Sequence, residues 1–309
     1  MALRIITADE RQAEERGVKA AILGKPGMGK TWLLNTTCAV TTLFMDLEAG
    51  DLAVQGWRGA SIRPRTWEEC RDLALFLAGP NPALRDDQPY SAAQHARVVR
   101  EYGDPARMDH YVTLFIDSIT VAGRLCFQWC RGQPEAFAER TGKPDVRGAY
   151  GLHGREMIAW LTHLQHARGR NVIFVGILDE KLDDFNRRVF SLQIEGSKTS
   201  LELPGIVDEV LTLAEIKDQG GPLFRALVCQ TLNPWGYPAK DRSGRLDLLE
   251  PPDLGRLFAK IAARKHPVRR RPRCRRRSSR PPPTPPTPDR SRAPWLPGTT
   301  TTTPSPTRT

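Results

Sequence analysis

The chain has 309 residues, 39% of them hydrophobic, so it is long and apolar enough to bury a core. Its net charge of +11 suggests a nucleic-acid-binding protein. The charge is uneven, however, because residues 264–309 contain 13 Lys and Arg and one Asp, a net charge of +12. Residues 1–263 therefore have a net charge of −1. The composition excludes a uniformly basic body, and the lack of a signal peptide or of an apolar run near ~18 residues indicates a soluble, cytoplasmic protein.

Short apolar runs alternate along the chain with stretches typical of helices. The runs predict strands at residues 18–23, 43–47, 61–63, 112–116, 171–178, 207–213 and 224–231. The other stretches predict helices at residues 30–38, 66–78, 91–102, 119–131, 150–168 and 253–263. One of these helices has a clear start, because Thr66 and Glu69 form a capping box. Residues 181–204 are expected to be irregular or to form a hairpin.

Several of these strands are continuous apolar runs, which is typical of a parallel sheet covered by helices on both faces. No helix separates the final two strands, so we expect an antiparallel edge. The predicted fold class is therefore α/β with a mostly parallel sheet, in one domain at 17–263 that follows an extension at 1–16. The Arg-, Pro- and Thr-rich tail at 264–309 cannot bury apolar surface and is predicted to be disordered. It is a solvated appendage, a frameshifted end or a nonspecific DNA- or RNA-binding arm.

A phosphate-binding loop follows the first strand. Residues 24–31 match the pattern GxxxxGK[ST] in full, between a strand and a helix, which is the context that this motif requires. Glycines let backbone N–H groups turn toward phosphate oxygens, Lys30 supplies a charge for the β- and γ-phosphates, and the Thr31 hydroxyl can ligate Mg²⁺. We predict ATP and Mg²⁺ as cofactors. The predicted nucleotide-binding residues are Gly24, Lys25, Pro26, Gly27, Met28, Gly29, Lys30, Thr31 and Trp32.

Carboxylates at the ends of two other strands complete a candidate catalytic site. Asp117 ends the run VTLFID, where open α/β sheets place their sites, and is predicted to hold Mg²⁺ together with Thr31. Residue 118 is Ser, so the base that orients water does not directly follow Asp117 as it does in many P-loop ATPases. Glu48, at the end of the second strand, is the predicted base. Asp46 is its rival, because residues two apart point to the same face of a strand.

These motifs resemble the RecA/RadA branch of P-loop ATPases. FMDLEAGD at 44–51 is similar to the F-D-x-E setting of that branch's catalytic glutamate, and Asp117-Ser118 resembles its Walker B "DS". More closely, residues 17–263 resemble phage-encoded RecA/RadA-like ATP-binding proteins of the Sak type, AAA-family ATPases linked to single-strand annealing and recombination. The stretches that carry this resemblance are DLEAGDLAVQGW (46–57), IRPRTWEECRDL (62–73), RGAYGLHGREMIAWLTHLQHARG (147–169) and NPWGYPAKDRSGRLD (233–247). It implies a RecA-like core in a bacterial host cell.

The resemblance implies two further sets of site residues. In RecA-like proteins the segments after the Walker B strand and after the next strand hold single-stranded DNA, and they correspond here to about 132–150 and 181–200. Lys240 and Arg242 resemble the KxRxG finger, whose Lys and Arg reach the γ-phosphate of a neighbouring subunit in a ring or filament. With Lys30 and Glu48 they are the predicted catalytic residues. The predicted DNA-binding residues are Arg140, Lys143, Arg147, Arg187, Arg188 and Lys198, beside Tyr150 and Lys181.

One departure concerns the γ-phosphate sensor. RecA has a glutamine at the end of the strand before its second DNA segment, whereas this strand has Gly176 or Ile177 there. Either another residue such as Asp179 senses the nucleotide, or the coupling between ATP and DNA is weak. We predict a DNA-stimulated P-loop ATPase that acts on single-stranded DNA in phage recombination or annealing, as a homo-oligomer, with a phage or host single-strand-binding protein as a further partner and no membrane partner. The alternatives are a non-catalytic ATP-dependent annealing module and a ring-type DNA motor such as a helicase or packaging ATPase.

Overall fold

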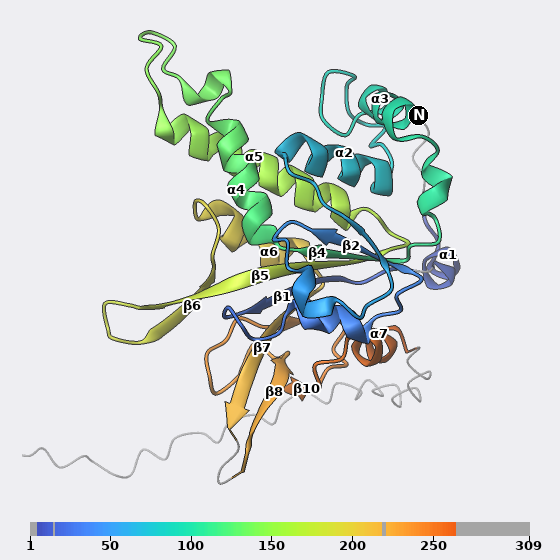
Figure 1. Ribbon diagram of the computed structural model, residues 1–309, viewed down its shortest axis with the longest axis vertical. Coiled ribbons are helices and arrows are strands. Elements are labelled where there is room, and N and C mark those ends of the chain that lie inside the picture. The colour runs from blue at the N-terminus through green and yellow to red at the C-terminus, as the bar shows by residue number, and fades with distance from the viewer. Residues whose placement is uncertain (1–4, 15, 218–220, 264–309) are drawn as a thin grey trace, which may run out of the picture. The chain divides into compact units, whose positions relative to one another are not determined.

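A mixed β-sheet runs through the centre of the molecule (Figure 1). Its main strands are β1 (Lys19–Gly24), β2 (Thr42–Asp46), β3 (Ala60–Ile62), β4 (Thr113–Asp117), β5 (Asn171–Leu182), β7 (Glu209–Lys217), β8 (Leu223–Val228) and β10 (Leu249–Glu250). They lie in the order β10-β8-β7-β1-β5-β4-β2-β3. Every neighbouring pair from β7 to β3 is parallel, whereas β8 and β10 join antiparallel at one edge. The predicted α/β class, with its mostly parallel sheet and antiparallel edge, is confirmed.

The computed structural model describes residues 5–14, 16–217 and 221–263. One compact unit extends from Met1 to Ala263, and the predicted tail at 264–309 lies outside the described residues. Helix α1 (Ala8–Ala13) begins at a capping box, in which the Thr7 hydroxyl accepts from the backbone N–H of Glu10. Among the described residues, no helix combines the length and the apolar composition needed to cross a membrane.

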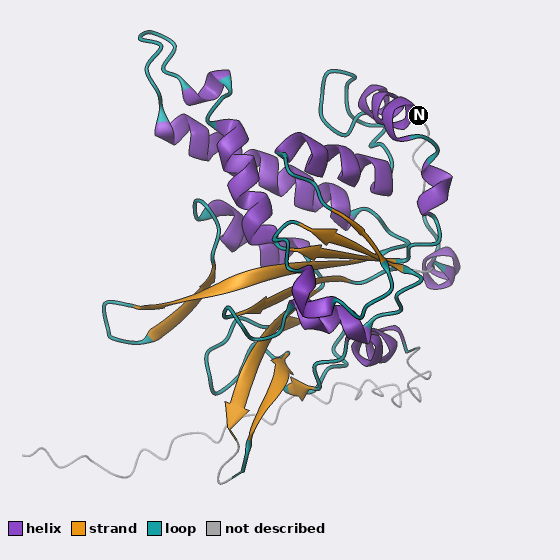
Figure 2. Ribbon diagram, in the orientation of Figure 1, coloured by secondary structure: helices purple, strands orange, loops and turns teal. Residues whose placement is uncertain are grey.

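Helices cover both faces of the sheet (Figure 2). On one face lie α2 (Trp67–Ala78), α4 (Ile119–Cys130), α5 (Val146–Gln165) and α6 (Lys198–Ile206), with α3 (Ala92–Tyr102) packed on α2. On the other face lie α7 (Leu254–Ala262) and the short 3₁₀ helices η1 (Thr31–Thr36) and η2 (Asp51–Val54). Two further 3₁₀ turns, η3 (Pro105–Met108) and η4 (Pro134–Ala136), lie in connections. Helix α2 begins at the predicted capping box of Thr66 and Glu69.

Alternation along the strands separates two apolar cores. Leu23 of β1 packs toward α2, α4 and α5, whereas its neighbour Ile22 packs toward η1 and α7. In the first core the rings of Trp67 and Trp160 lie 5.7 Å apart and join α2 to α5. Each fully buried side chain of this size contributes about 1.5–3 kcal/mol through removal from water. Because both faces are covered, the open ends of the strands are where ligands can reach the sheet.

The carboxyl ends of three parallel strands meet at one edge of the sheet. Asp46 at the end of β2 is in register with Asp117 at the end of β4. Asp117 is in turn beside Val175 of β5, two residues before Ile177, which pairs with Gly24 at the end of β1. The sheet therefore brings the phosphate loop and both predicted carboxylate segments to the same edge.

Two predicted elements differ from the structure. The predicted helix at 30–38 is the six-residue 3₁₀ helix η1, whose end is tightened by Thr36 and Thr37 hydroxyls that donate to the carbonyls of Leu33 and Leu34. In the segment 181–204, the hairpin alternative is correct for β5 and β6 (Arg188–Leu192), which pair antiparallel. Helix α6 was missed there, because it contains a proline and no side chain caps its start.

Candidate nucleotide site

The phosphate loop joins β1 to η1. Gly27 and Gly29 have φ angles of 77° and 90°, a region that favours glycine, so the loop can turn its backbone N–H groups to one side. Lys30 donates from Nζ to the carbonyls of Gly24 and Lys25, both at 2.9 Å. Burial lowers the pKa of Lys30, while Asp117 and Glu48 oppose this shift. Of the other predicted loop residues, Met28 packs on the core beside η1, and Pro26 and Trp32 are exposed.

Asp117 lies beside the loop at the end of β4. Its side chain accepts a hydrogen bond of 2.6 Å from the Thr31 hydroxyl, and the residue is 2% exposed. Burial raises the pKa of Asp117 to about 6; the Thr31 hydrogen bond opposes this, and nearby Glu48 adds to it. The two predicted Mg²⁺ ligands, Thr31 and Asp117, are thus adjacent. Their electrostatics favour a cation, which would offset the cost of a buried carboxylate.

The oxygen donors here suit Mg²⁺ rather than a metal held by protein alone. Among the described residues, no group of three or more His, Cys, Asp or Glu side chains is arranged to hold a metal ion. Mg²⁺ is typically bound by one or two protein oxygens together with substrate phosphates and water. The hydroxyl of Thr31 and the carboxylate of Asp117, beside a phosphate loop, provide this kind of partial set.

The two rival carboxylates at the end of β2 have different environments. Asp46 is 3% exposed, accepts a 3.0 Å hydrogen bond from the backbone N–H of Gly50, and lies 3.5 Å from Nε of Arg63. Glu48 is exposed and accepts a hydrogen bond from the hydroxyl of Ser118, the residue after Asp117. Asp46 therefore holds the loop in shape, and Glu48 presents a carboxylate at the edge where the phosphate loop lies.

A chain of ion pairs leads from the phosphate loop to the β5–β6 hairpin. Lys25 pairs with Glu180 near the end of β5, and the other oxygen of Glu180 lies 3.3 Å from Nε of Arg188 on β6. The pairing with Lys25 lowers the pKa of Glu180, so the carboxylate is ionised at neutral pH. Asp179, which the sequence suggests as an alternative γ-phosphate sensor, pairs with Lys181 at 3.0 Å. The loop is thus linked to a predicted DNA segment through Glu180.

Two arginines reach this edge without any motif that indicates them. Arg63, just after β3, pairs with Asp51 as well as Asp46. Arg225 of β8 lies against the phosphate loop, since a Cβ placed on Gly29 would be 3.2 Å from its Nη1. The contact of Arg225 depends on the pairing of β8 with β7 and of β7 with β1, strands far apart in sequence, so no local pattern could have found it.

Lys240 and Arg242 lie at the opposite edge of the sheet. The short strand β9 (Lys240–Asp241) pairs with the start of β7, at Glu209 and Val210. Lys240 donates to the carbonyl of Val207 at 2.8 Å, and Arg242 lies 3.0 Å from Asp208. The structure does not bring these residues to the phosphate loop of the same chain. Their predicted role at the γ-phosphate would therefore require the nucleotide of a neighbouring subunit.

The six predicted DNA-binding residues are all exposed; Lys198 begins α6, and the other five lie around the α4–α5 connection and on the β5–β6 hairpin, which project beyond the sheet (Figure 1). The predicted DNA segments, 132–150 and 181–200, approach each other where a Cβ placed on Gly196 would lie 3.4 Å from the ring of Tyr150. A hollow of about 410 Å³ lies there, between the first turns of α5 and residues 195–198, and includes Lys198. Tyr150 is 42% exposed and stacks on Phe127 with ring centroids 4.5 Å apart. Arg140, Lys143 and Arg147 lie in or near the α4–α5 connection, and Arg187 and Arg188 on the β5–β6 hairpin.

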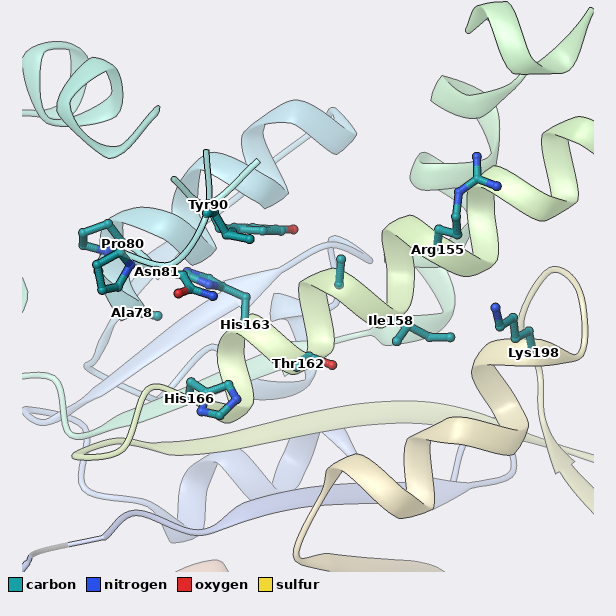
Figure 3. Close-up of a pocket in the computed structure, with 14 residues that line it drawn as sticks. Ala78, Pro80, Asn81, Tyr90, Arg155, Ile158, Thr162, His163, His166 and Lys198 are labelled. Atoms are coloured by element: carbon teal, nitrogen blue, oxygen red, sulfur yellow. The ribbon is translucent and has the colours of Figure 1, made fainter. Parts of the chain in front are cut away.

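A separate cavity of about 670 Å³ lies on the face of the sheet that α2 and α5 cover, between residues 78–84 and α5 (Figure 3). Tyr90 and His163 stack there with ring centroids 4.3 Å apart, and burial lowers the pKa of His163 to about 4. Arg155 and Lys198 lie toward its other end. No residue of the phosphate loop lines this cavity, so it is distinct from the nucleotide site.

Comparisons with known proteins give the family. Among solved structures, the chain resembles an ATPase from the type III secretion system of pathogenic bacteria, at 16% identity over 64% of this chain and 51% of that one, with a TM-score of 0.32. It also resembles the flagellar accessory protein FlaH from Methanocaldococcus jannaschii, at 9% identity over 69% and 77% of the two chains, with a TM-score of 0.29. The chain spans about half the length of the first of these. No curated protein sequence matches. A family model described as an AAA domain matches residues 16–243, most of the chain, which therefore belongs to this AAA domain family.

Proposed function

We propose that this chain binds ATP with Mg²⁺ and hydrolyses it. The observation that supports this most is a cluster formed by three chain segments at one edge of the sheet. Thr31 is hydrogen-bonded to Asp117 at 2.6 Å, and Ser118 is hydrogen-bonded to Glu48. A P-loop in an AAA domain makes nucleotide binding the expected use of this edge. A carboxylate that can act on water is the part that binding alone would not require.

Each residue of the cluster has a separate task in this proposal. Lys30 would exchange its loop carbonyls for the β- and γ-phosphates, and Thr31 with Asp117 would hold Mg²⁺. Mg²⁺, when bound, neutralises charge that develops on the transferred phosphoryl group. Glu48 would orient the attacking water and take up its proton. Ser118 positions Glu48 through the hydrogen bond that links β4 to the loop after β2.

Replacement of each rival carboxylate tests this assignment. Glu48→Gln should bind ATP as the wild type does and lose about 100-fold or more in turnover, because it removes a catalytic base. Asp46→Asn is the matched comparison, since it removes a negative charge two residues away. Asp46→Asn should lower the free energy of unfolding and largely keep the rate of ATP hydrolysis, because Asp46 holds the loop through Gly50. Full turnover in Glu48→Gln would exclude Glu48 as the base.

We further propose that the ATPase acts on single-stranded DNA in phage recombination or annealing, as the resemblance to Sak-type proteins implies. The feature that favours single strands is Tyr150, an exposed aromatic ring beside a hollow that Lys198 borders. Sequence-independent binding of single strands uses stacking on such rings together with basic side chains along the backbone. The basic side chains of both projecting segments are exposed and available for this purpose.

Stimulation of ATP hydrolysis by DNA is the measurement that separates this role from nonspecific binding of DNA by the basic tail at 264–309. Tyr150→Ala and Lys198→Ala should leave basal hydrolysis unchanged and weaken its stimulation by oligo(dT). Arg100→Ala, which removes an exposed arginine from α3, is the control and should have no effect. Equal stimulation in all three variants would contradict the proposed DNA surface.

We also propose that the active form is a homo-oligomer in which Lys240 and Arg242 serve a neighbour's site. They lie at the edge opposite the phosphate loop. A head-to-tail ring or filament places unlike faces of successive subunits together, so residues at opposite edges can meet. Mixing Lys30→Ala with Arg242→Ala protein tests this, because each can supply what the other lacks. Recovery of hydrolysis on mixing would support the role, and two inactive proteins that stay inactive would contradict it.

A further inference from the structure

A β-hairpin carries a charged pair out to the phosphate loop. β7 and β8 pair antiparallel, and Glu215 stands opposite Arg225 in the register. Two residues from this pair, toward the base of the hairpin, Leu213 and Leu227 are buried in the core that contains η1. Residues two apart share a face of a strand, so Glu215 and Arg225 continue this face beyond the core.

The phosphate loop lies directly along this face. β7 pairs with β1, and the carbonyl oxygen of Leu213 would lie 2.8 Å from a Cβ placed on Gly24. Farther out on the hairpin, Nη1 of Arg225 would lie 3.2 Å from a Cβ placed on Gly29. The guanidinium therefore rests against the last glycine of the loop, the residue before Lys30.

The charge of Arg225 is placed for a ligand rather than for the fold. Its side chain is 52% exposed, and Nε lies 3.5 Å from Glu215, whose side chain is 42% exposed. An ion pair this exposed contributes about 0–1 kcal/mol to stability. A guanidinium also offers several donors in a planar fork that suits phosphate oxygens. Because Arg225 lies beside the phosphate loop, its guanidinium could bind a phosphate group of a nucleotide. Glu215 is its ionic partner in the structure, at 3.5 Å.

We propose that Arg225 binds the polyphosphate of the nucleotide held by the same chain. This inference rests on the proposed nucleotide binding and goes beyond it, because it adds a second cation that no motif indicates. The chain would then supply Lys30 from the loop and Arg225 from the hairpin to the phosphates of one nucleotide. It would do so before any neighbouring subunit contributes a charge.

Binding of mant-ADP, followed by fluorescence, tests the contact on the full chain. Arg225→Ala should weaken affinity about tenfold, the effect of losing one charge-assisted hydrogen bond, and Arg225→Lys should recover part of it. Lys217→Ala is the matched control, because Lys217 lies two residues beyond Glu215 on the same face and is exposed. It should bind within about twofold of the wild type, since a charge farther from the loop is screened by solvent.

Displacement of mant-ADP by tripolyphosphate identifies the part of the nucleotide concerned. Arg225→Ala should weaken tripolyphosphate by the same factor as mant-ADP, because the contact is to phosphate. A loss seen only with mant-ADP would assign Arg225 to the base or ribose and overturn the inference. So would affinities within twofold of the wild type, or an equal loss in Lys217→Ala. If the wild type binds no mant-ADP, the proposed function fails as well; if Lys30→Ala loses binding and Arg225→Ala does not, only this inference fails.

Discussion

The two edges of the sheet hold similar charged residues in different situations. At the amino edge, Asp208 pairs with Arg16 and Arg242 and accepts from the backbone N–H of Lys19, so its partners lie within the chain. At the carboxyl edge, Lys30 is bonded to carbonyls of its own loop, and the buried carboxylate of Asp117 meets a neutral hydroxyl. Lys30 and Asp117 are thus hydrogen-bonded to neutral groups, and a nucleotide with Mg²⁺ could supply them with the ionic partners that Asp208 already has within the chain.

Lys19 at the start of β1 and Lys30 at the end of the phosphate loop give the largest contrast. Lys30→Ala should reduce ATP hydrolysis by about 100-fold or more, because it removes a phosphate donor, and should leave stability close to wild type. Lys19 is 1% exposed and donates to the carbonyls of Ala167 and Arg170 at 2.9 and 2.6 Å. Lys19→Ala should cost about 3 kcal/mol of unfolding free energy, since it leaves buried carbonyls without a donor. Hydrolysis rates and urea denaturation of both variants measure this contrast. Unfolding of Lys30→Ala, or wild-type stability of Lys19→Ala, would contradict the assignment of one lysine to the ligand and the other to the fold.

The next effect is the pH dependence that Asp117 gives to stability. Its pKa is raised to about 6, so between about pH 4 and 6 the unfolded chain loses this proton first. The part of the unfolding free energy that depends on Asp117 should therefore fall across this range by about 2–3 kcal/mol. Asp117→Asn should remove this fall and be more stable than wild type at pH 7. Urea denaturation at several pH values compares the two proteins.

Mg²⁺ and nucleotide sharpen the same comparison. If they bind at Asp117, the wild type should lose the part of its pH dependence that Asp117 gives when both are present, because the carboxylate is then stabilised as an anion. Asp117→Asn should gain far less stability from them. Parallel pH profiles for the two proteins, with and without Mg²⁺-ATP, would show that Asp117 is not the group responsible.

A smaller effect is expected at the amino edge. Arg242→Ala removes a 3.0 Å ion pair to a nearly buried carboxylate and should cost about 1–2 kcal/mol of unfolding free energy. Arg256→Ala, on α7, serves as the control, since no ion pair is found for it among the described residues. Chemical denaturation of both variants provides the measurement. Equal free energies of unfolding for Arg242→Ala and Arg256→Ala would mean that Arg242 does not stabilise the fold and is available to a neighbouring subunit.

What the sequence could predict follows from the range of the interactions. The phosphate loop, the strand that ends in Asp117 and the capping box at Thr66 are local patterns, and the structure contains each of them. The contacts of Lys25 with Glu180 and of Arg225 with Gly29 join residues more than 150 positions apart. They follow from the order of strands in the sheet, which no local pattern specifies. Asp46 and Glu48 likewise could be separated only when their partners, Gly50 and Ser118, were known.

The most direct test of the account is steady-state ATP hydrolysis by the full chain, with and without oligo(dT), beside Glu48→Gln. We predict Mg²⁺-dependent turnover in the wild type that rises with single-stranded DNA, and a loss of about 100-fold or more in Glu48→Gln with ATP binding retained. Turnover that Glu48→Gln leaves unchanged would contradict the account of the carboxyl edge. Turnover that DNA does not change would contradict the proposed role on single-stranded DNA.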